Sequence, residues 1–259
     1  MPHAPAPRNA RMAPPMPEPP AAMPWAMDRR ALTAALRARQ ALAPPSPPAR
    51  GPVPLCPAID RALPAGGLAR AGLHEVLAAD PAAAAAFCAL VLARAAAGQG
   101  AVLWIAADPT ARPPGLARFG LAPADLLLVR APGPADALWA MEEALRCPGI
   151  AAALLLTETM PGAAAATRLQ QAAGTGGGLG LLLGPDADSP APGEAALTRW
   201  RVTALSDSAA PLEDPRWQLA LLRCRGGQPG SWPVTWRPAA ESLTLDAADP
   251  PEGPGRRHR

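Results

Sequence analysis

The chain has 259 residues and a formal net charge of +3, and 49% of its residues are hydrophobic, which is enough for one large folded domain or two small ones. Proline accounts for 37 residues, an excess that helix interiors and central strands cannot hold. All 24 basic residues are arginines, because the sequence contains no lysine. This excludes Schiff-base catalysis and a phosphate loop of the GxxxxGK[ST] type, since both require a lysine.

The 4 cysteines and 3 histidines are widely dispersed, and no two cysteines form a CxxC pair. This spacing does not support a zinc site and is typical of a protein in a reducing compartment. The N-terminal residues lack the apolar stretch of a signal peptide, and no suitable apolar run reaches the roughly 18 residues of a membrane span. We therefore expect a cytoplasmic protein with no metal, no cofactor and no membrane contact.

Three segments of different composition precede the main domain. Residues 1–27 are rich in Pro, Ala and Met and are predicted to be a disordered tail, and residues 43–55 are predicted to be a proline-rich linker. Between them, residues 28–42 carry apolar and arginine positions at helical spacing, which predicts an amphipathic helix. Two interpretations of this helix stay open: it docks on the domain, or it is detached and binds a partner.

Residues 56–240 are predicted to form one α/β domain. Apolar runs predict buried strands at 73–77, 101–107, 126–131, 150–156 and 178–184. Helical patterns lie between them at 81–100, 135–147 and 163–173. This alternation predicts a mostly parallel, doubly wound sheet with helices on both faces.

The pattern changes in the C-terminal part of this domain. Segments 195–205, 216–225 and 231–238 alternate polar and apolar residues, and the turn GGQPG at 226–230 joins the last two. We expect these segments to extend the sheet with antiparallel strands. A disordered tail is predicted over 241–259.

The first strand-to-helix junction is where an α/β nucleotide-binding domain holds phosphates, on the free amides of the helix N-terminus. Here the sequence VLAADPAAAAAF (76–87) has no glycine to open the loop, no lysine, and no Ser or Thr to hold magnesium. The carboxylate of Asp80 also places a negative charge where phosphates should lie. We therefore interpret this junction as a degenerate phosphate loop without a catalytic residue. Its members are Ala79, Asp80, Ala82, Ala83, Ala84 and Ala85.

The C-terminal segments interleave arginine with tryptophan, and they hold four of the 7 tryptophans of the chain. Arginine neutralises phosphates and tryptophan stacks on bases, a combination that suits single-stranded DNA and is also common at protein interfaces. Strand alternation, however, places Trp200 opposite Arg199 and Arg201, which also fits a tryptophan core with a solvated arginine rim. The candidate DNA or partner contacts are Arg199, Arg201, Arg216, Arg223, Arg225, Trp232 and Arg237.

Other single residues have simpler interpretations. His74 lies on a predicted strand and lacks the second histidine of a zinc-protease motif, so we expect a half-buried histidine with its hydrogen bonds satisfied. Asp108 and Glu158 end strands where acids activate water or bind magnesium in α/β enzymes, but without a bound phosphate we expect structural caps. Glu142 lies four residues before Arg146, which predicts an ion pair along one helix.

Seven segments carry a family resemblance. They are AIDRALPAGGLARAGLHEV (58–76), VLWIAAD (102–108), PPGLARFGLAPADLLLVRA (113–131), LWAMEEALRCPGIAAAL (138–154), TRLQQAAG (167–174), TRWRV (198–202) and RWQLALLRCRGGQPGSWPVTW (216–236). In this order they resemble the ATPase core of RecA-type recombinases and, more closely, the ImuA family. The segment TRLQQAAG is less basic than the arginine-rich version usual in that family.

The resemblance implies a RecA-like fold without a working ATP site and without catalytic residues. It also implies a role in the SOS-induced mutasome, which copies past DNA lesions. The implied partners are an ImuB-type polymerase-like protein and an error-prone replicative-type polymerase. Two other functions stay open at this point: an active RecA/KaiC-type ATPase, which the missing lysine disfavours, and a cell-division inhibitor that resembles SulA.

Overall fold

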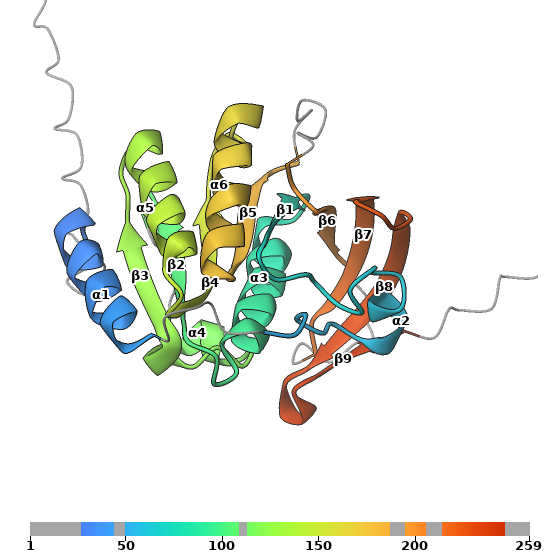
Figure 1. Ribbon diagram of the computed structural model, residues 1–259. Coiled ribbons are helices and arrows are strands. Elements are labelled where there is room, and N and C mark those ends of the chain that lie inside the picture. Colours follow the sequence, from blue (N-terminus) through green and yellow to red (C-terminus); the bar gives the residue numbers. More distant parts are fainter. Residues whose placement is uncertain (1–26, 44–49, 109–112, 187–194, 206–213, 247–259) are drawn as a thin grey trace, which may run out of the picture.

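The computed structural model describes residues 27–43, 50–108, 113–186, 195–205 and 214–246. Within them, a single mixed sheet has the strand order β3-β2-β4-β5-β1-β6-β7-β8-β9 (Figure 1). The parallel strands are β1 (Gly72–Ala78), β2 (Ala101–Ala106), β3 (Leu126–Arg130), β4 (Ile150–Leu156), β5 (Leu179–Pro185) and β6 (Thr198–Ala204). The strands that follow are antiparallel: β7 (Arg216–Cys224), β8 (Gly230–Arg237) and β9 (Ser242–Leu245). The predicted α/β class with an antiparallel C-terminal part is confirmed.

Helices cover both faces of the parallel strands. The helices of the described residues are α1 (Arg29–Leu42), α2 (Pro57–Asp60), α3 (Pro81–Ala96), α4 (Pro113–Ala117), α5 (Pro134–Arg146) and α6 (Ala163–Gly176), with short 3-10 turns at Pro123–Asp125 and Pro238–Ala240. Alternate residues of β4 enter two different cores: Leu154 packs in the layer of α3, and Leu155 packs in the layer of α5 and α6. This is the reason why the central strands are apolar at every position.

Two sequence expectations about the C-terminal strands are corrected. Strand β6 runs parallel to β1, so the antiparallel part of the sheet begins with β7 and not with residues 195–205. Strand β9 lies inside the segment predicted to be a disordered tail, because Leu243 is buried against the sheet after a turn at Glu241 with a φ of 47°. The remaining tail predictions, for 1–26 and 247–259, lie outside the described residues.

The N-terminal helix α1 is docked and not detached. Leu32 and Leu36 are buried in the core that α5 contributes to. The guanidinium of Arg29 lies 4.1 Å from the ring centroid of Trp139 and pairs with Asp136 at 3.3 Å. The interpretation of α1 as a detached partner-binding helix is therefore wrong for this structure.

The second half of the predicted linker belongs to the domain, which corrects the expectation for 50–55; residues 44–49 are not described. Val53 is buried and forms an antiparallel bridge with Leu68. The Arg50 guanidinium donates to the carbonyls of Ile150, Gln99 and Pro148 at 3.2, 2.8 and 2.7 Å. Sequence reasoning missed this role because the acceptors are backbone groups far along the chain. None of the described helices has the length and apolarity that a membrane crossing needs.

Candidate functional site

The turn between β1 and α3 is the place where a RecA-like domain would hold phosphates, and here it has only two residues. Strand β1 ends at Ala78 and helix α3 begins at Pro81, so Ala79 and Asp80 form the whole connection. A turn of this length cannot wrap around a phosphate group as a glycine-rich loop does.

Two of the amides at the start of α3, those of Ala83 and Ala84, already have a partner. The Asp80 carboxylate accepts from the Ala83 amide at 2.9 Å, and the Asp80 carbonyl accepts from the Ala84 amide at 2.9 Å. Pro81 has no N–H group to offer. Asp80 is thus a helix N-cap, and its carboxylate lies where an anion would bind.

The other members of the predicted phosphate loop are in the first turn of α3. Ala83 and Ala84 are buried, Ala82 is exposed, and Ala85 is half-buried. The structure therefore brings together the residues that the sequence predicted. They form a capped helix N-terminus and not an open phosphate-binding loop.

Beside this turn, the carboxyl ends of four parallel strands surround a cavity of about 690 Å³. Its lining is almost entirely apolar, and Glu158 is the charged residue among the described residues that line it. The lining residues are Ala78, Pro81, Ala82, Ala85, Trp104, Leu116, Leu156, Thr157, Glu158, Leu183, Gly184 and Pro185. The sequence predicted the edge on which this cavity lies, but its lining comes from segments that only the fold brings together.

The two acids predicted as structural caps do not act as caps. Asp108 follows β2 and Glu158 follows β4, and both are exposed. Neither carboxylate has a hydrogen bond or an ion pair within the described part of the chain. Both therefore add unneutralised negative charge to the carboxyl edge of the sheet.

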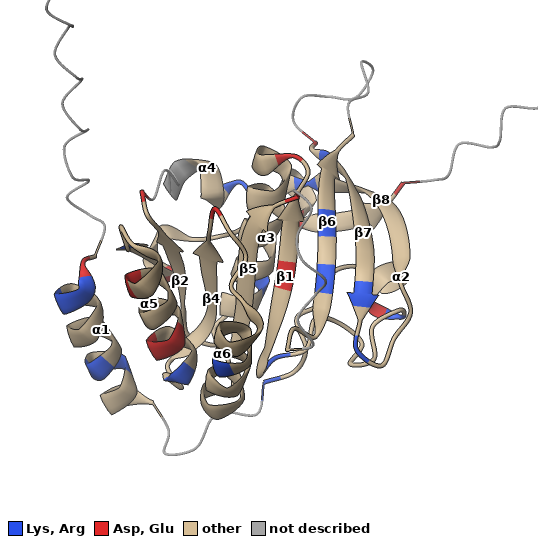
Figure 2. Cartoon of the chain, turned by 90° about the horizontal axis from the view of Figure 1, so that it is seen from above, with Lys and Arg blue, Asp and Glu red and all other residues tan. Residues whose placement is uncertain are grey.

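Arg199 is buried and does not lie on a surface, which corrects its prediction as a DNA or partner contact. Its Nε donates to Oε2 of Glu75 at 2.6 Å, and the two residues are 6% and 3% exposed. Figure 2 shows the basic position of β6 beside the acidic position of β1. The pairing is a direct consequence of the parallel register, in which Glu75 lies opposite Arg199.

A chain of hydrogen bonds fixes His74 on the other side of the same strand pair. His74 Nε2 lies 2.8 Å from the Ala69 carbonyl, so this nitrogen carries the proton. His74 Nδ1 then accepts from the Thr198 hydroxyl at 2.7 Å, and that oxygen accepts from Trp200 Nε1 at 2.8 Å. Burial lowers the pKa of His74 to about 4, so the ring is neutral at pH 7. The histidine is satisfied, as expected, but it is fully buried and not half-buried.

The other predicted contacts on the C-terminal strands join segments of this chain to one another. Arg201 pairs with Asp186 at 2.8 Å, Arg216 with Asp246 at 2.9 Å, and Arg237 with Asp214 at 3.6 Å. Arg223 and Arg225 donate to the carbonyls of Ala196 and Ala195, each at 3.2 Å.

The tryptophans of these strands belong to the core. Trp200, Trp217 and Trp236 are at most 2% exposed, and Trp232 is half-buried with its ring centroid 6.2 Å from that of Trp200. No stacking platform of tryptophans faces solvent on the described part of β6, β7 and β8. A role of the exposed arginines in DNA or partner binding stays a prediction.

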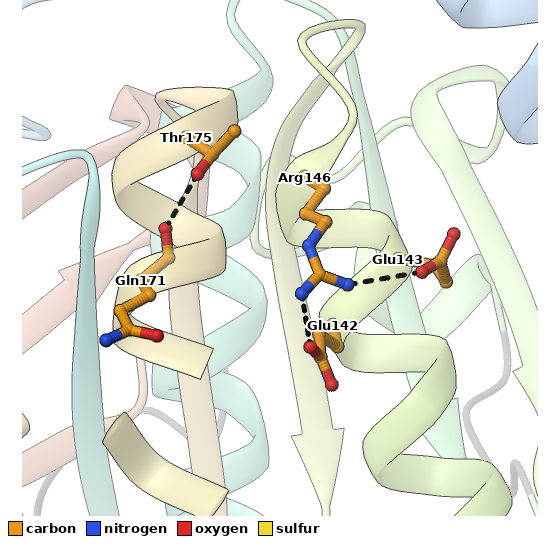
Figure 3. A network of polar contacts seen from close by, with 5 residues as sticks. All are labelled: Glu142, Glu143, Arg146, Gln171 and Thr175. Carbon is orange, nitrogen blue, oxygen red and sulfur yellow. Dashed lines mark hydrogen bonds and ion pairs between the residues drawn. The ribbon is translucent and has the colours of Figure 1, made fainter. Parts of the chain in front are cut away.

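The ion pair predicted on α5 is confirmed. Arg146 pairs with Glu142 at 2.5 Å and with Glu143 at 3.4 Å, beside the Gln171 and Thr175 positions of α6 (Figure 3). Because Arg146 is half exposed, this network contributes at most about 0.5 kcal/mol per pair to stability.

Comparison with known proteins agrees with this geometry. No protein-family model matches the chain. The crystal structure of the RadB recombinase superposes with a TM-score of 0.54 and 11% sequence identity, over 71% of this chain and 94% of that one. The arrangement of strands and helices defines a RecA-like domain.

The sequence comparison is more specific. Two curated relatives, each named Protein ImuA and found in two strains of Caulobacter vibrioides, are 38% identical to this chain over 195 residues. The match covers 68% of this chain and 79% of each relative. The chain belongs to the ImuA family.

Proposed function

We propose that this protein is a non-catalytic accessory protein of SOS-induced translesion DNA synthesis. It uses its RecA-like domain as a scaffold and assembles with an ImuB-type protein and an error-prone polymerase. Membership of the ImuA family supports the role in SOS-induced translesion DNA synthesis. The observation that carries the non-catalytic part is the capped turn at Asp80.

The electrostatics of the carboxyl edge support this proposal. A nucleotide triphosphate brings several negative charges, and each unit charge about 4 Å from another like charge costs roughly 4 kcal/mol near a protein surface. Asp80 and Glu158 lie at this site, and no arginine is among the described residues that line the cavity. The chain has no lysine to offset that repulsion.

Two measurements on the purified chain test the non-catalytic part. We expect no ATP hydrolysis above background, with or without single-stranded DNA. We also expect no heat of binding when magnesium and ATP are titrated into the protein in a calorimeter. Robust hydrolysis would contradict the proposal and favour the RecA/KaiC-type ATPase.

A deletion strain tests the role in SOS-induced translesion DNA synthesis. Deletion of the gene is expected to abolish mutagenesis induced by DNA damage, and a plasmid copy should restore it. Filamentation of undamaged cells on overexpression, with normal induced mutagenesis in the deletion strain, would instead favour the inhibitor that resembles SulA.

Capture of the ImuB-type protein tests the assembly, and the structure decides which variant is suitable. Removal of 195–259 would delete β6, which pairs with β1 in the centre of the sheet, so the domain would unfold. The substitution Arg201→Glu changes an exposed side chain instead, with Arg168→Glu on α6 as a matched control. Weaker capture by the first variant alone would place the partner on the C-terminal strands.

A further inference from the structure

The cavity at the carboxyl edge is built to hold apolar groups. Trp104 is 3% exposed and forms part of its wall, together with small residues at the start of α3 and at the ends of β1 and β5. Its volume of about 690 Å³ lies in the range of ligand-binding pockets and is far larger than the space that one water molecule occupies. No positively charged side chain is among the described residues of this lining, so an anion has no charged partner there.

The apolar surface continues beyond the cavity. Leu156 belongs to the lining and is 38% exposed, which makes it one of few large apolar side chains in the described part of the chain that are held out in solvent. A small ligand inside the cavity would leave much of this leucine exposed. A peptide segment that enters the cavity and leaves across its mouth covers both.

Two exposed carboxylates lie at this edge of the sheet, in or near the cavity. Glu158 lies in the lining, and Asp108 follows the neighbouring strand β2 at the same edge; neither carboxylate is paired within the described residues. An occupant with a cationic group next to its apolar group is therefore complementary, and an acidic one is repelled.

From these observations we propose that the cavity is a docking site for a peptide segment of a partner protein, in which a large apolar side chain is flanked by basic residues. The proposal rests on the proposed scaffold function and specifies the chemistry of one of its contacts. The cavity beside the degenerate phosphate loop would then bind a partner without binding phosphate.

A pair of dye-labelled peptides tests the proposal by fluorescence anisotropy on the full chain. The probes are acetyl-Arg-Leu-Trp-Arg with a C-terminal dye and its counterpart in which both arginines are glutamates. We expect the basic peptide to bind at least about tenfold more tightly than the acidic one, and Glu158→Lys to remove most of this preference. Equal binding of the two peptides, or no binding of either, would overturn the proposal.

A matched pair of variants tests the location. Ala82 and Ala135 are both exposed, and each follows the first-position proline of its helix, but only Ala82 lines the cavity. Ala82→Phe fills the cavity and is expected to weaken binding of the basic peptide at least about tenfold, whereas Ala135→Phe leaves it unchanged. Equal unfolding midpoints of the two variants show that the loss is local, and unchanged binding to Ala82→Phe overturns the proposal.

Titration of magnesium and ATP in the presence of the bound peptide separates this proposal from the scaffold function. Displacement of the peptide by ATP would contradict the scaffold function, because the site would then accept phosphate. Failure of the peptides without any binding of ATP would reject the docking site and leave the scaffold function intact.

Discussion

Glu75 on β1 and Arg199 on β6 form a buried ion pair between neighbouring parallel strands, with Nε and Oε2 at 2.6 Å. The two residues are 124 positions apart in the chain, and the register of β1 and β6 places them opposite each other. Removal of one charge leaves the other in the interior without compensation, which is costly even where the intact pair contributes little.

We therefore predict that Glu75→Leu lowers the free energy of unfolding by about 3–5 kcal/mol. The double variant Glu75→Leu with Arg199→Met should recover most of that loss, since no charge then remains buried. Urea unfolding followed by circular dichroism measures both effects. Glu143→Ala, which breaks an exposed pair, is the control and should change stability by less than about 0.5 kcal/mol. A loss below about 1 kcal/mol for Glu75→Leu would contradict the prediction.

The second prediction concerns pH. Burial of the ring lowers the pKa of His74 from its ordinary value of 6.5 to about 4. The unfolded chain therefore binds a proton at a higher pH than the folded chain does, and stability that is present above pH 6.5 is lost as the pH falls toward 4. We expect this one group to account for about 3 kcal/mol over that range.

Urea unfolding at pH 7, 5.5 and 4.5 tests the histidine. The variant His74→Gln has no imidazole to titrate, so its stability should fall less steeply over the same range. Because carboxylates also titrate at low pH, the difference between the two slopes is the quantity that matters. Parallel slopes would show that His74 does not contribute.

The third prediction concerns the cap of α3. Asp80→Ala removes the carboxylate that accepts from the Ala83 amide, and we expect a loss of about 1 kcal/mol in the free energy of unfolding. Asp80→Asn keeps an acceptor and should lose less. Calorimetry should detect no ATP binding to either variant, because the two-residue turn remains. Strong ATP binding by Asp80→Ala would show that this carboxylate alone closes the phosphate site.

The fourth prediction concerns α1. Leu32 is completely buried, so Leu32→Ala should weaken the docking of α1 by about 2–5 kcal/mol. Hydrogen exchange is expected to become faster in α1, while β1 in the centre of the sheet keeps its protection. Arg30→Ala, at an exposed position of the same helix, is the control. Uniformly faster exchange in both elements would show that α1 is an inseparable part of the domain.

Much of the fold was predictable from local patterns. The strands β2, β4 and β5 are continuous apolar runs, and α3 and α5 each begin at a proline, so period and capping residues identify them without any tertiary contact. The strand at the C-terminal edge of the sheet has a weaker sequence pattern. Strand β9 has four residues and follows Pro238–Ala240, and its strand conformation depends on pairing with β8.

For the candidate site too, some features follow from the sequence and others only from the tertiary structure. The sequence by itself determined that the β1–α3 junction lacks a lysine and glycines and carries an acid, because these are properties of residue identity. Only the tertiary structure decided that Asp80 caps α3, that Arg199 is buried against Glu75, and that the strand ends enclose an apolar cavity. The physical reason is that the burial of a side chain depends on which distant segments pack against it, and neither composition nor period contains that information.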